Sequence, residues 1–303
     1  MGITKRILSV KDVLMANKYP IYIPSKSRID IKLTAHFFME DKIDFKIVVE
    51  PQEYKGYCAK YGKDKVLCLP LGNQGLIYSR LWIREHSIKN GFDRHWQFDD
   101  NIYYLGRMHK RKKIRCNANI AIKIVEDFTD RYENIALSGF NYDTFVRAGL
   151  KKPYYLNTHC YSAFLLDNRT KYKWRLEWND DVDICLQIVD SGYHCTVQFN
   201  AFYARKATTM SVKGGLTTQY NIKDTRYKGA CLLRDQWPQY VKVVEKYGRW
   251  HFSIKNAWRD FKQPLIRRTD IDWDNIKNKK YNIKLKKINN IKNKSLKKWY
   301  NNF

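Results

Sequence analysis

Short apolar runs alternate with longer segments of helical apolar spacing over the first 105 residues. The runs "YPIYIPS", from Tyr19 to Ser25, "DFKIVVEP", ending at Pro51, and "KVLCLP", ending at Pro70, predict three strands. The stretch "IKLTAHFFME" has helical character, and "LIYSRLWIREHSIKNG" predicts a helix that ends at Gly91. A fourth strand is predicted over "HWQFDDNIYYL". This succession predicts an α/β fold.

The order of these elements predicts a Rossmann-type sheet, mixed but mostly parallel, with helices packed against it. Ligands of such sheets bind at the carboxyl ends of the strands. Pro24 and Ser25, Glu50, and the tripeptide Asp99, Asp100, Asn101 all fall at predicted strand ends. We therefore expect the functional site there.

The second half of the chain continues the same alternation and then changes in composition. Its predicted elements are a helix over about 117–132, strands at "NIALSGF" and "YSAFLLD", a capped helix at "WNDDVDICLQIVDSGY" and a strand at "HCTVQFNAFYARK". Helical pieces are predicted around "ACLLRDQWPQYVKVVEKYG", and a Lys- and Asn-rich tail follows. We predict three parts: a main domain over 1–222, a helical C-terminal subdomain over 223–273, and a basic tail over 274–303.

Charge narrows the choice of partner. Of 303 residues, 57 are Lys or Arg and 30 are Asp or Glu, a formal net charge of +27. Such an excess attracts polyanions such as nucleic acid. A general bias toward Lys and Asn is the alternative, but the basic residues cluster in "GRMHKRKKIR" and in the tail. The block "GRMHKRKKIR" is either a polyanion-binding surface or a solvated charged face. The tail is either a mobile polyanion-binding arm or a segment that docks as a short helix.

The chain has no predicted membrane span or export signal. No apolar run approaches the roughly 20 residues that a spanning helix needs, and the N-terminus lacks a secretory apolar core. Seven scattered cysteines favour free thiols and a reducing compartment. We expect a cytoplasmic protein, in the host cell cytoplasm if the source is viral, and the oligomeric state is left open.

The tripeptide Asp99, Asp100, Asn101 is the first candidate site. Carboxylate and amide oxygens are the ligands that Mg²⁺ or Mn²⁺ prefers, and a bound cation would offset the repulsion between the carboxylates. The alternative is a turn in which these side chains bond their own backbone.

A second acidic pair, Asp180 and Asp181, opens the helix predicted after Asn179. Capping and the helix dipole explain at least one of these aspartates. A second carboxylate at this helix start is either another cap or a candidate general base that takes a proton from an attacking hydroxyl. The seven histidines occur singly, so His159 and His194 are interpreted as packed residues and not metal ligands.

The order of these motifs resembles that of nucleotide-sugar-dependent glycosyltransferases of the GT-A fold, over roughly residues 19–220. More narrowly, "PIYIPSKSR", "VVEPQEY", "WQFDDNI", "LNTHCYSAFLLDN", "EWNDDVDICLQIVDSG" and "KGGLTTQY" resemble the phage and TET-associated glycosyltransferases. That family is linked to sugar decoration of 5-hydroxymethylpyrimidines in DNA, such as 5-hydroxymethylcytosine.

The resemblance implies a role for individual residues of the donor site. Glu50 would reach the base or ribose, and Arg80 would offer a fork to the diphosphate. The residues placed at the nucleotide sugar are Pro24, Ser25, Arg28, Glu50, Gly75, Arg80, Asp99, Gly214 and Gly215. The loop at Lys213, Gly214 and Gly215 is either a lid over the donor or a plain turn.

The resemblance also implies a metal site and a catalytic base. Asp99, Asp100 and Asn101 match a metal motif that usually ends in Asp, so the ligands are either Asp99 with Asn101 or Asp100 alone. Asp181 matches the catalytic base of inverting enzymes and Asp180 the residue before it. The usual Glu-Asp is Asp-Asp here, which leaves the two roles exchangeable.

We therefore expect a Mn²⁺- or Mg²⁺-dependent, inverting hexosyltransferase. It would use a UDP-type donor such as UDP-glucose and a hydroxymethylated pyrimidine in DNA as acceptor. Tyr154, Tyr155 and Tyr161 are candidates for stacking on an extruded base, with core packing as the alternative. Two other hypotheses remain: a glycosyltransferase for protein or glycan acceptors, and a non-catalytic nucleic-acid-binding protein.

Overall fold

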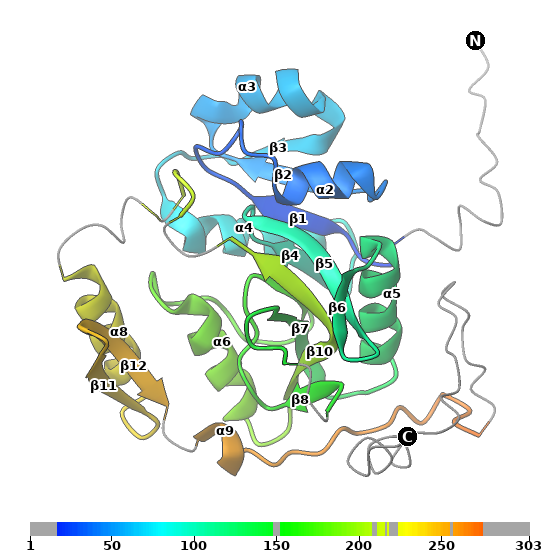
Figure 1. Cartoon of the computed structure of the whole chain (residues 1–303), viewed down its shortest axis with the longest axis vertical. Coiled ribbons are helices and arrows are strands. Elements are labelled where there is room, and N and C mark those ends of the chain that lie inside the picture. Colours follow the sequence, from blue (N-terminus) through cyan, green and yellow to red (C-terminus); the bar gives the residue numbers. More distant parts are fainter. Residues whose placement is uncertain are drawn as a thin grey trace.

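A ten-stranded sheet forms the body of the protein (Figure 1). The computed structural model describes residues 17–147, 152–207, 211–215, 217, 224–254 and 257–274. In spatial order the strands are β3 (Val66–Cys68), β2 (Lys46–Val49), β1 (Ile21–Pro24), β4 (Arg94–Phe98), β9 (Ala163–Asp167), β7 (Ile135–Tyr142), β10 (Cys195–Lys206), β5 (Ile102–His109) and β6 (Lys112–Arg115), with β8 (Tyr154–Leu156) paired to β10. The first four strands of the sequence are parallel, and antiparallel pairs join β4, β9 and β7. The predicted α/β fold with a mixed sheet is confirmed.

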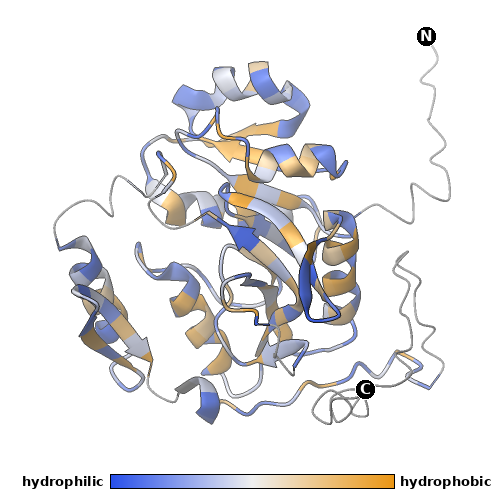
Figure 2. Cartoon of the chain, viewed as in Figure 1, coloured by the Kyte–Doolittle hydropathy of each residue, from blue (hydrophilic) through white to orange (hydrophobic). Residues whose placement is uncertain are grey.

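Helices cover both faces of the sheet because its strands bury apolar side chains on both sides. Alternate residues of β1 show this: Ile21 and Ile23 join one core and Tyr22 joins the other. The first core lies under α2 (Thr34–Glu40), α3 (Pro51–Tyr61) and α5 (Ala118–Thr129). The opposite face packs against α4 (Gly75–Lys89) and α6 (Asp180–Val189). Figure 2 shows the resulting apolar colouring of the central strands.

The stretch predicted as a fourth strand is in fact two strands, so that prediction is wrong. β4 ends at Phe98, the chain turns over residues 99–101, and β5 begins at Ile102. The two strands are not neighbours, because β4 pairs with β1 and β9 while β5 pairs with β10 and β6. The acidic tripeptide breaks the strand and lies beside the carboxyl ends of β1 and β4.

Two further elements differ from the prediction. Helix α3 was not predicted, although Pro51 occupies its first turn, where proline is favoured. The stretch predicted as helical pieces around 230–248 is helical only in its first part: α8 covers Thr225–Gln236, and a hairpin of β11 (Val241–Lys246) and β12 (Arg249–Ile254) follows. Tyr247 and Gly248 both have positive φ, the geometry of a two-residue hairpin turn, and this turn selects the hairpin.

The C-terminal segments pack onto the main body. Leu233, Trp237 and Val241 form a core cluster with Val182 and Leu186 of α6, and α9 (Ala257–Asp260) follows. The predicted divisions at 222 and 273 stay predictions, and the basic tail lies outside the described residues apart from Asp274. None of the described helices is long and apolar enough to cross a bilayer.

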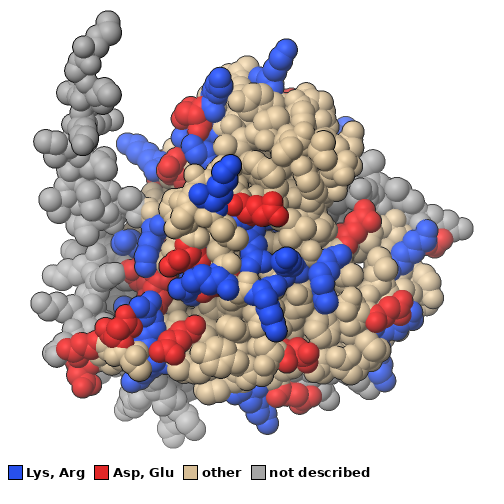
Figure 3. Space-filling model, turned by 180° about the vertical axis from the view of Figure 1, so that it is seen from behind, with Lys and Arg blue, Asp and Glu red and all other residues tan. Residues whose placement is uncertain are grey.

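The basic block after the acidic tripeptide forms the β5–β6 hairpin. Its turn residues Lys110 and Arg111 are exposed, as are Lys112, Lys113 and Arg115 of β6. The face of the molecule that is hidden in Figure 1 carries Lys and Arg side chains interspersed with Asp and Glu (Figure 3). All seven cysteines are free, as predicted.

Candidate active site

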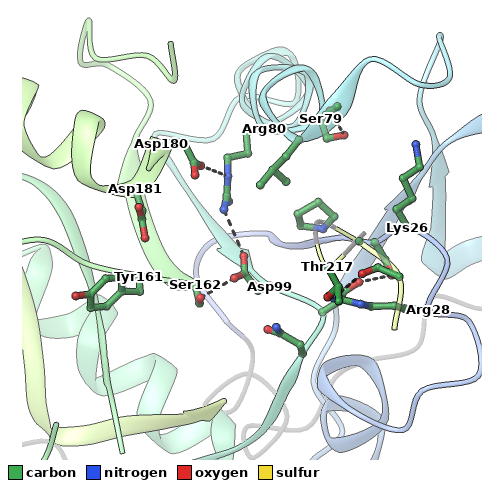
Figure 4. A pocket seen from close by; sticks show the side chains of 18 of the residues that line it. Lys26, Arg28, Ser79, Arg80, Asp99, Tyr161, Ser162, Asp180, Asp181 and Thr217 are labelled. Atoms are coloured by element: carbon green, nitrogen blue, oxygen red, sulfur yellow. Dashed lines mark hydrogen bonds and ion pairs between the residues drawn. The ribbon is translucent and has the colours of Figure 1, made fainter. Parts of the chain in front are cut away.

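A cavity of about 610 Å³ opens at the carboxyl ends of β1, β2 and β4 (Figure 4). The sheet topology explains its position, because parallel strands bring their following loops to one edge. Every residue nominated for the donor, the metal ion or the catalytic base lines this cavity: Pro24, Ser25, Arg28, Glu50, Gly75, Arg80, Asp99, Asp100, Asn101, Asp180, Asp181, Gly214 and Gly215. Residues separated by almost 200 positions thus meet at one site.

Asp99 is neutralised by two cations. Its Oδ2 accepts hydrogen bonds from Ser162 Oγ at 2.6 Å and Lys206 Nζ at 3.0 Å, and its Oδ1 lies 3.3 Å from Arg80 Nη2. Burial raises the pKa of Asp99, but Lys206 and Arg80 outweigh burial and lower it to about 2. Asp99 is therefore a permanently charged carboxylate.

Asp100 pairs with residues that follow β1. Its Oδ1 forms an ion pair with Arg28 Nη1, and its Oδ2 accepts a hydrogen bond from Ser25 Oγ at 2.8 Å. Burial raises the pKa of Asp100, and Arg28 and Ser25 oppose the rise. Of the four carboxylate oxygens in the tripeptide, each one already contacts a protein donor.

Arg80 does not face the cavity as a free fork for phosphate, in contrast to the implied role. Its Nε lies 2.7 Å from Asp180 Oδ2, its Nη1 donates to Gln97 Oε1 at 3.0 Å, and its Nη2 contacts Asp99. The residue is only 3% exposed. Arg80 therefore bridges the two acidic motifs and holds them at a fixed separation.

Glu50 ends β2 and organises the loop after β3. Its carboxylate accepts hydrogen bonds from Lys26 Nζ at 3.0 Å, from the backbone N–H of Asn73 at 3.0 Å and from Gln52 Nε2 at 2.6 Å. Lys26, which the sequence analysis did not nominate, also contacts Asn73 Oδ1 at 3.1 Å and remains partly exposed in the cavity.

The loop at residues 213–215 closes over the loop that follows β1. Arg28 donates to the carbonyl oxygens of Lys213 at 3.1 Å and Gly214 at 3.0 Å, and the N–H of Gly215 donates to the carbonyl of Lys26 at 2.9 Å. A Cβ on Gly214, whose φ is +81°, would lie 2.4 Å from the carbonyl oxygen of Ser27. Only glycine fits this approach.

The second acidic pair lies at the first turn of α6. Asp180 pairs with Arg80, whereas Asp181 accepts a hydrogen bond only from the backbone N–H of Val182, at 2.9 Å, within the described residues. Burial and the neighbouring charge of Asp180 raise the pKa of Asp181 to about 7, against the opposing effects of Arg80 and Lys206. Asn179 occupies the N-cap position with φ 58° and forms no side-chain cap.

Aromatic residues line the side of the cavity near Asp181. Tyr142 and Tyr161 are stacked, with ring centroids 4.7 Å apart and an interplanar angle of 18°, and both line the cavity. Tyr154 and Tyr155 instead belong to β8, where Tyr154 packs on Phe128 and Phe199, and neither lines the cavity. Of the three nominated tyrosines, only Tyr161 reaches the site.

Both histidines that were interpreted as packed residues have packing partners. The imidazole of His159 contacts the rings of Tyr161 and Trp258. His194 lies 2.8 Å from the hydroxyl of Tyr172.

The two carboxylates predicted as metal ligands have protein partners, and their role as metal ligands stays a prediction. Asp99 and Asp100 are occupied by Lys206, Arg80, Arg28 and two serines, as described above. Among the described residues, the Oδ1 atom of Asn101 is buried and without a hydrogen-bond partner, but one amide oxygen does not make a metal site. No cluster of three or more His, Cys, Asp or Glu residues in the described ranges could hold a metal ion.

Several residues of the site escaped the sequence analysis. Lys206, Ser162 and Tyr142 meet at Asp99: Lys206 Nζ lies 2.6 Å from Ser162 Oγ and 3.3 Å from the hydroxyl of Tyr142. Phe252 of β12 adds a wall from the C-terminal segment. Their only signal is position at or near a strand end, which lone Lys, Ser and Tyr residues share with many others.

Comparison with solved structures adds no functional argument. One similar chain is mannose-6-phosphate isomerase from Helicobacter pylori, with 10% identity, a TM-score of 0.30, and coverage of 83% of this chain and 94% of that chain. None of the curated proteins matches the sequence.

Comparison with protein families is decisive. The family described as TET-Associated Glycosyltransferase matches residues 19–215, the segment that supplies nearly all of the cavity lining. The match covers more than half of the chain and includes both acidic motifs. The chain therefore belongs to the TET-associated glycosyltransferase family and is a glycosyltransferase.

Proposed function

We propose that the protein transfers a sugar from a UDP-type nucleotide-sugar donor to the hydroxyl group of a 5-hydroxymethylpyrimidine in DNA, with inversion at the sugar carbon. The family match supports glycosyl transfer and an oxidised DNA base as acceptor. The geometry of the cavity supports the assignment of a donor side and an acceptor side.

The observation that carries the proposal is the state of Asp181. This carboxylate is half-buried, lines the cavity and has a pKa raised to about 7. A general base works best when its pKa is close to the operating pH, since it is then both ionised and basic. Asp180 is engaged by Arg80 and is less suited to the task.

The donor side of the cavity is basic and glycine-lined. Lys26 and Arg28 lie there with the loop of Gly214 and Gly215, and the first turn of α4 contributes Gly75. Backbone N–H groups at a helix start and basic side chains favour a phosphate group. We assign the nucleoside diphosphate to this side.

The acceptor side is aromatic. Figure 4 shows Asp181 and Tyr161 on the side of the cavity opposite Lys26 and Arg28. Chemistry on a base requires its extrusion from the duplex, and an aromatic pocket offsets the lost stacking. We assign the extruded base to the stacked Tyr142 and Tyr161 pair, on the side of the cavity where Asp181 lies.

In the transfer step, the carboxylate of Asp181 takes the proton of the acceptor hydroxyl while the oxygen of that hydroxyl attacks the anomeric carbon of the sugar. The bond between that carbon and the diphosphate oxygen breaks, and the nucleoside diphosphate leaves with the electron pair. Attack from the side opposite the leaving group inverts the configuration.

The β5–β6 hairpin supports a DNA acceptor. β5 leaves the cavity directly after Asn101 and ends at the exposed basic turn of Lys110 and Arg111. Contacts of this kind to phosphates position DNA without reading its sequence. Binding should weaken steeply with rising salt concentration.

The test is mass spectrometry of nucleosides released from DNA after incubation with the protein and a panel of nucleotide sugars. Hydroxymethylated DNA should acquire one hexose per modified base, and unmodified DNA should acquire none. Transfer to glycan or protein acceptors in its place, or DNA binding without turnover, would overturn the proposal.

A further inference from the structure

We propose that the ammonium group of Lys206 supplies, beside Asp99, the positive charge for the donor diphosphate that the sequence pattern assigns to a divalent cation. This inference rests on the proposed function, because it concerns the nucleotide-sugar donor of that reaction. If Lys206 supplies this charge, the donor binds without a metal ion, and Lys206 is a donor-binding residue.

The backbone places Lys206 at the site. It is the last residue of β10, and the pairing of β10 with β5 shifts register between Arg205 and Lys206. Such bulges redirect a side chain, and they recur next to active sites. Here the side chain enters the cavity, where Nζ contacts Asp99 Oδ2 at 3.0 Å and Ser162 Oγ at 2.6 Å.

The charges around the tripeptide leave no carboxylate for a metal ion. Asp99 is shared by Lys206 and Arg80, and Asp100 is paired with Arg28. A metal ion bound to Asp99 Oδ2 would have to displace the ammonium group of Lys206, which contacts the same oxygen. Lys206 and a metal ion therefore compete for Asp99 Oδ2.

Lys206 is also suited to a phosphate. Its side chain is 18% exposed, so the ammonium is held by the protein but reaches the cavity surface. Two of its three contacts are to the neutral hydroxyls of Ser162 and Tyr142. Exchange of one of these for a phosphate oxygen keeps the ion pair with Asp99 and adds a charge-assisted bond.

The first experiment measures the affinity of the wild-type protein by calorimetry. The probes are UDP, CDP, GDP and ADP with their parent nucleosides, each titrated in EDTA and again in Mn²⁺. We expect the preferred diphosphate to bind with the same affinity, within about twofold, in both buffers. A gain of tenfold or more in Mn²⁺ overturns the role of Lys206 and leaves the proposed function intact.

The second experiment uses variants. Lys206→Ala should lower the affinity for the diphosphate at least tenfold and leave that for the nucleoside within twofold, whereas Lys206→Arg should retain most of the diphosphate affinity. Lys89→Ala, an exposed lysine at the end of α4, is the matched control and should bind as wild type. Equal loss of nucleoside and diphosphate binding in Lys206→Ala would contradict the inference.

A third experiment measures Mn²⁺ binding at the position that the ammonium group of Lys206 occupies in the wild type. Lys206→Ala removes the ammonium from Asp99 Oδ2 and leaves Ser162 Oγ as its donor, while Asn101 Oδ1 of the same tripeptide has no hydrogen-bond partner among the described residues. This variant should therefore take up Mn²⁺, seen as loss of the free-ion signal in electron paramagnetic resonance. The wild type should leave that signal unchanged. Uptake by the wild type would overturn the inference. Failure of every nucleoside diphosphate to bind would overturn the proposed donor class as well.

Discussion

The two acidic motifs of the cavity contain the same residue type in opposite electrostatic states. Asp99 has two cations on its carboxylate, and its pKa is lowered to about 2. Asp181 forms no ion pair with a described residue, and its pKa is raised to about 7. The neighbours of a carboxylate, and not its identity, thus decide whether it stays charged or exchanges a proton.

Arg80 creates this asymmetry. It projects from α4 between the motifs and contacts Asp99 and Asp180. The guanidinium of Arg80 pairs with Asp180 and not with Asp181. Burial and the negative charge of Asp180 therefore raise the pKa of Asp181. The two roles that the sequence left exchangeable are therefore separated by one arginine, which favours Asp181 as the base.

The largest effect is expected from removal of the unpaired carboxylate. Asp181→Asn keeps the size and the hydrogen bond from Val182 but cannot accept a proton, so transfer should fall by about 10²- to 10⁴-fold. Nucleotide affinity should be unchanged, as checked by calorimetry. Asp190→Asn, at the opposite end of α6, is the control and should retain activity. Wild-type turnover in Asp181→Asn would refute the base assignment.

The paired carboxylate should matter most for stability. Asp99→Asn leaves Lys206 without its counter-charge and Arg80 with Asp180 alone, and loss of one partner of a buried pair costs about 3 kcal/mol in the free energy of unfolding. Asp181→Asn removes a charge that burial already disfavours and should not lower that free energy. Denaturant unfolding of both variants tests the contrast, and equal destabilisation would contradict it.

The loop at residues 213–215 holds Arg28, which pairs with Asp100. A change in this loop should therefore weaken that ion pair indirectly. Gly214→Ala forces a Cβ against the carbonyl of Ser27, at a φ of +81°, and should displace the loop that holds Arg28. We expect a loss of nucleotide affinity of roughly tenfold, corresponding to the lower end of the cost of such strain. Gly91→Ala also has positive φ, 78°, but no atom near its Cβ, and serves as the control for strain alone. Equal nucleotide affinity in the two variants would argue against a role for the loop.

The smallest effect is a shift in the pH profile. Asp181 must be ionised to act, so kcat/KM should rise as pH increases through about 7 and level off above it. Asp180→Asn removes the adjacent negative charge that helps to raise this pKa, so the rising limb should move down by about one pH unit. Asp190→Asn should leave the limb in place. A limb that does not move in Asp180→Asn would show that another group titrates.

The sequence predicted where the site would form with more success than what its residues would do. Residues at strand ends and first helical turns, such as Ser25, Glu50 and Asp181, could be nominated because a sheet edge and a helix start are readable from local pattern. Arg80 was nominated for phosphate, yet it lies buried among acidic side chains. Local pattern carries no information on which nitrogen meets which oxygen.

The same limit explains the errors in the fold. The strand predicted through "WQFDDNI" is two strands because the partners of β4 and β5 lie in distant segments, and pairing is a long-range choice. The later part of the stretch predicted as helical pieces forms the β11–β12 hairpin, because positive φ at Tyr247 and Gly248 is a property of the folded backbone.

The α/β alternation, the strand-end position of the acidic tripeptide and the acidic opening of α6 could be predicted from the sequence, because they depend on neighbours within a few residues. The contact of Lys206 with Asp99 and the pair of Arg80 with Asp180 follow from the tertiary fold alone. Those contacts join residues 107 and 100 positions apart along the chain, and the charge state of each carboxylate follows from them.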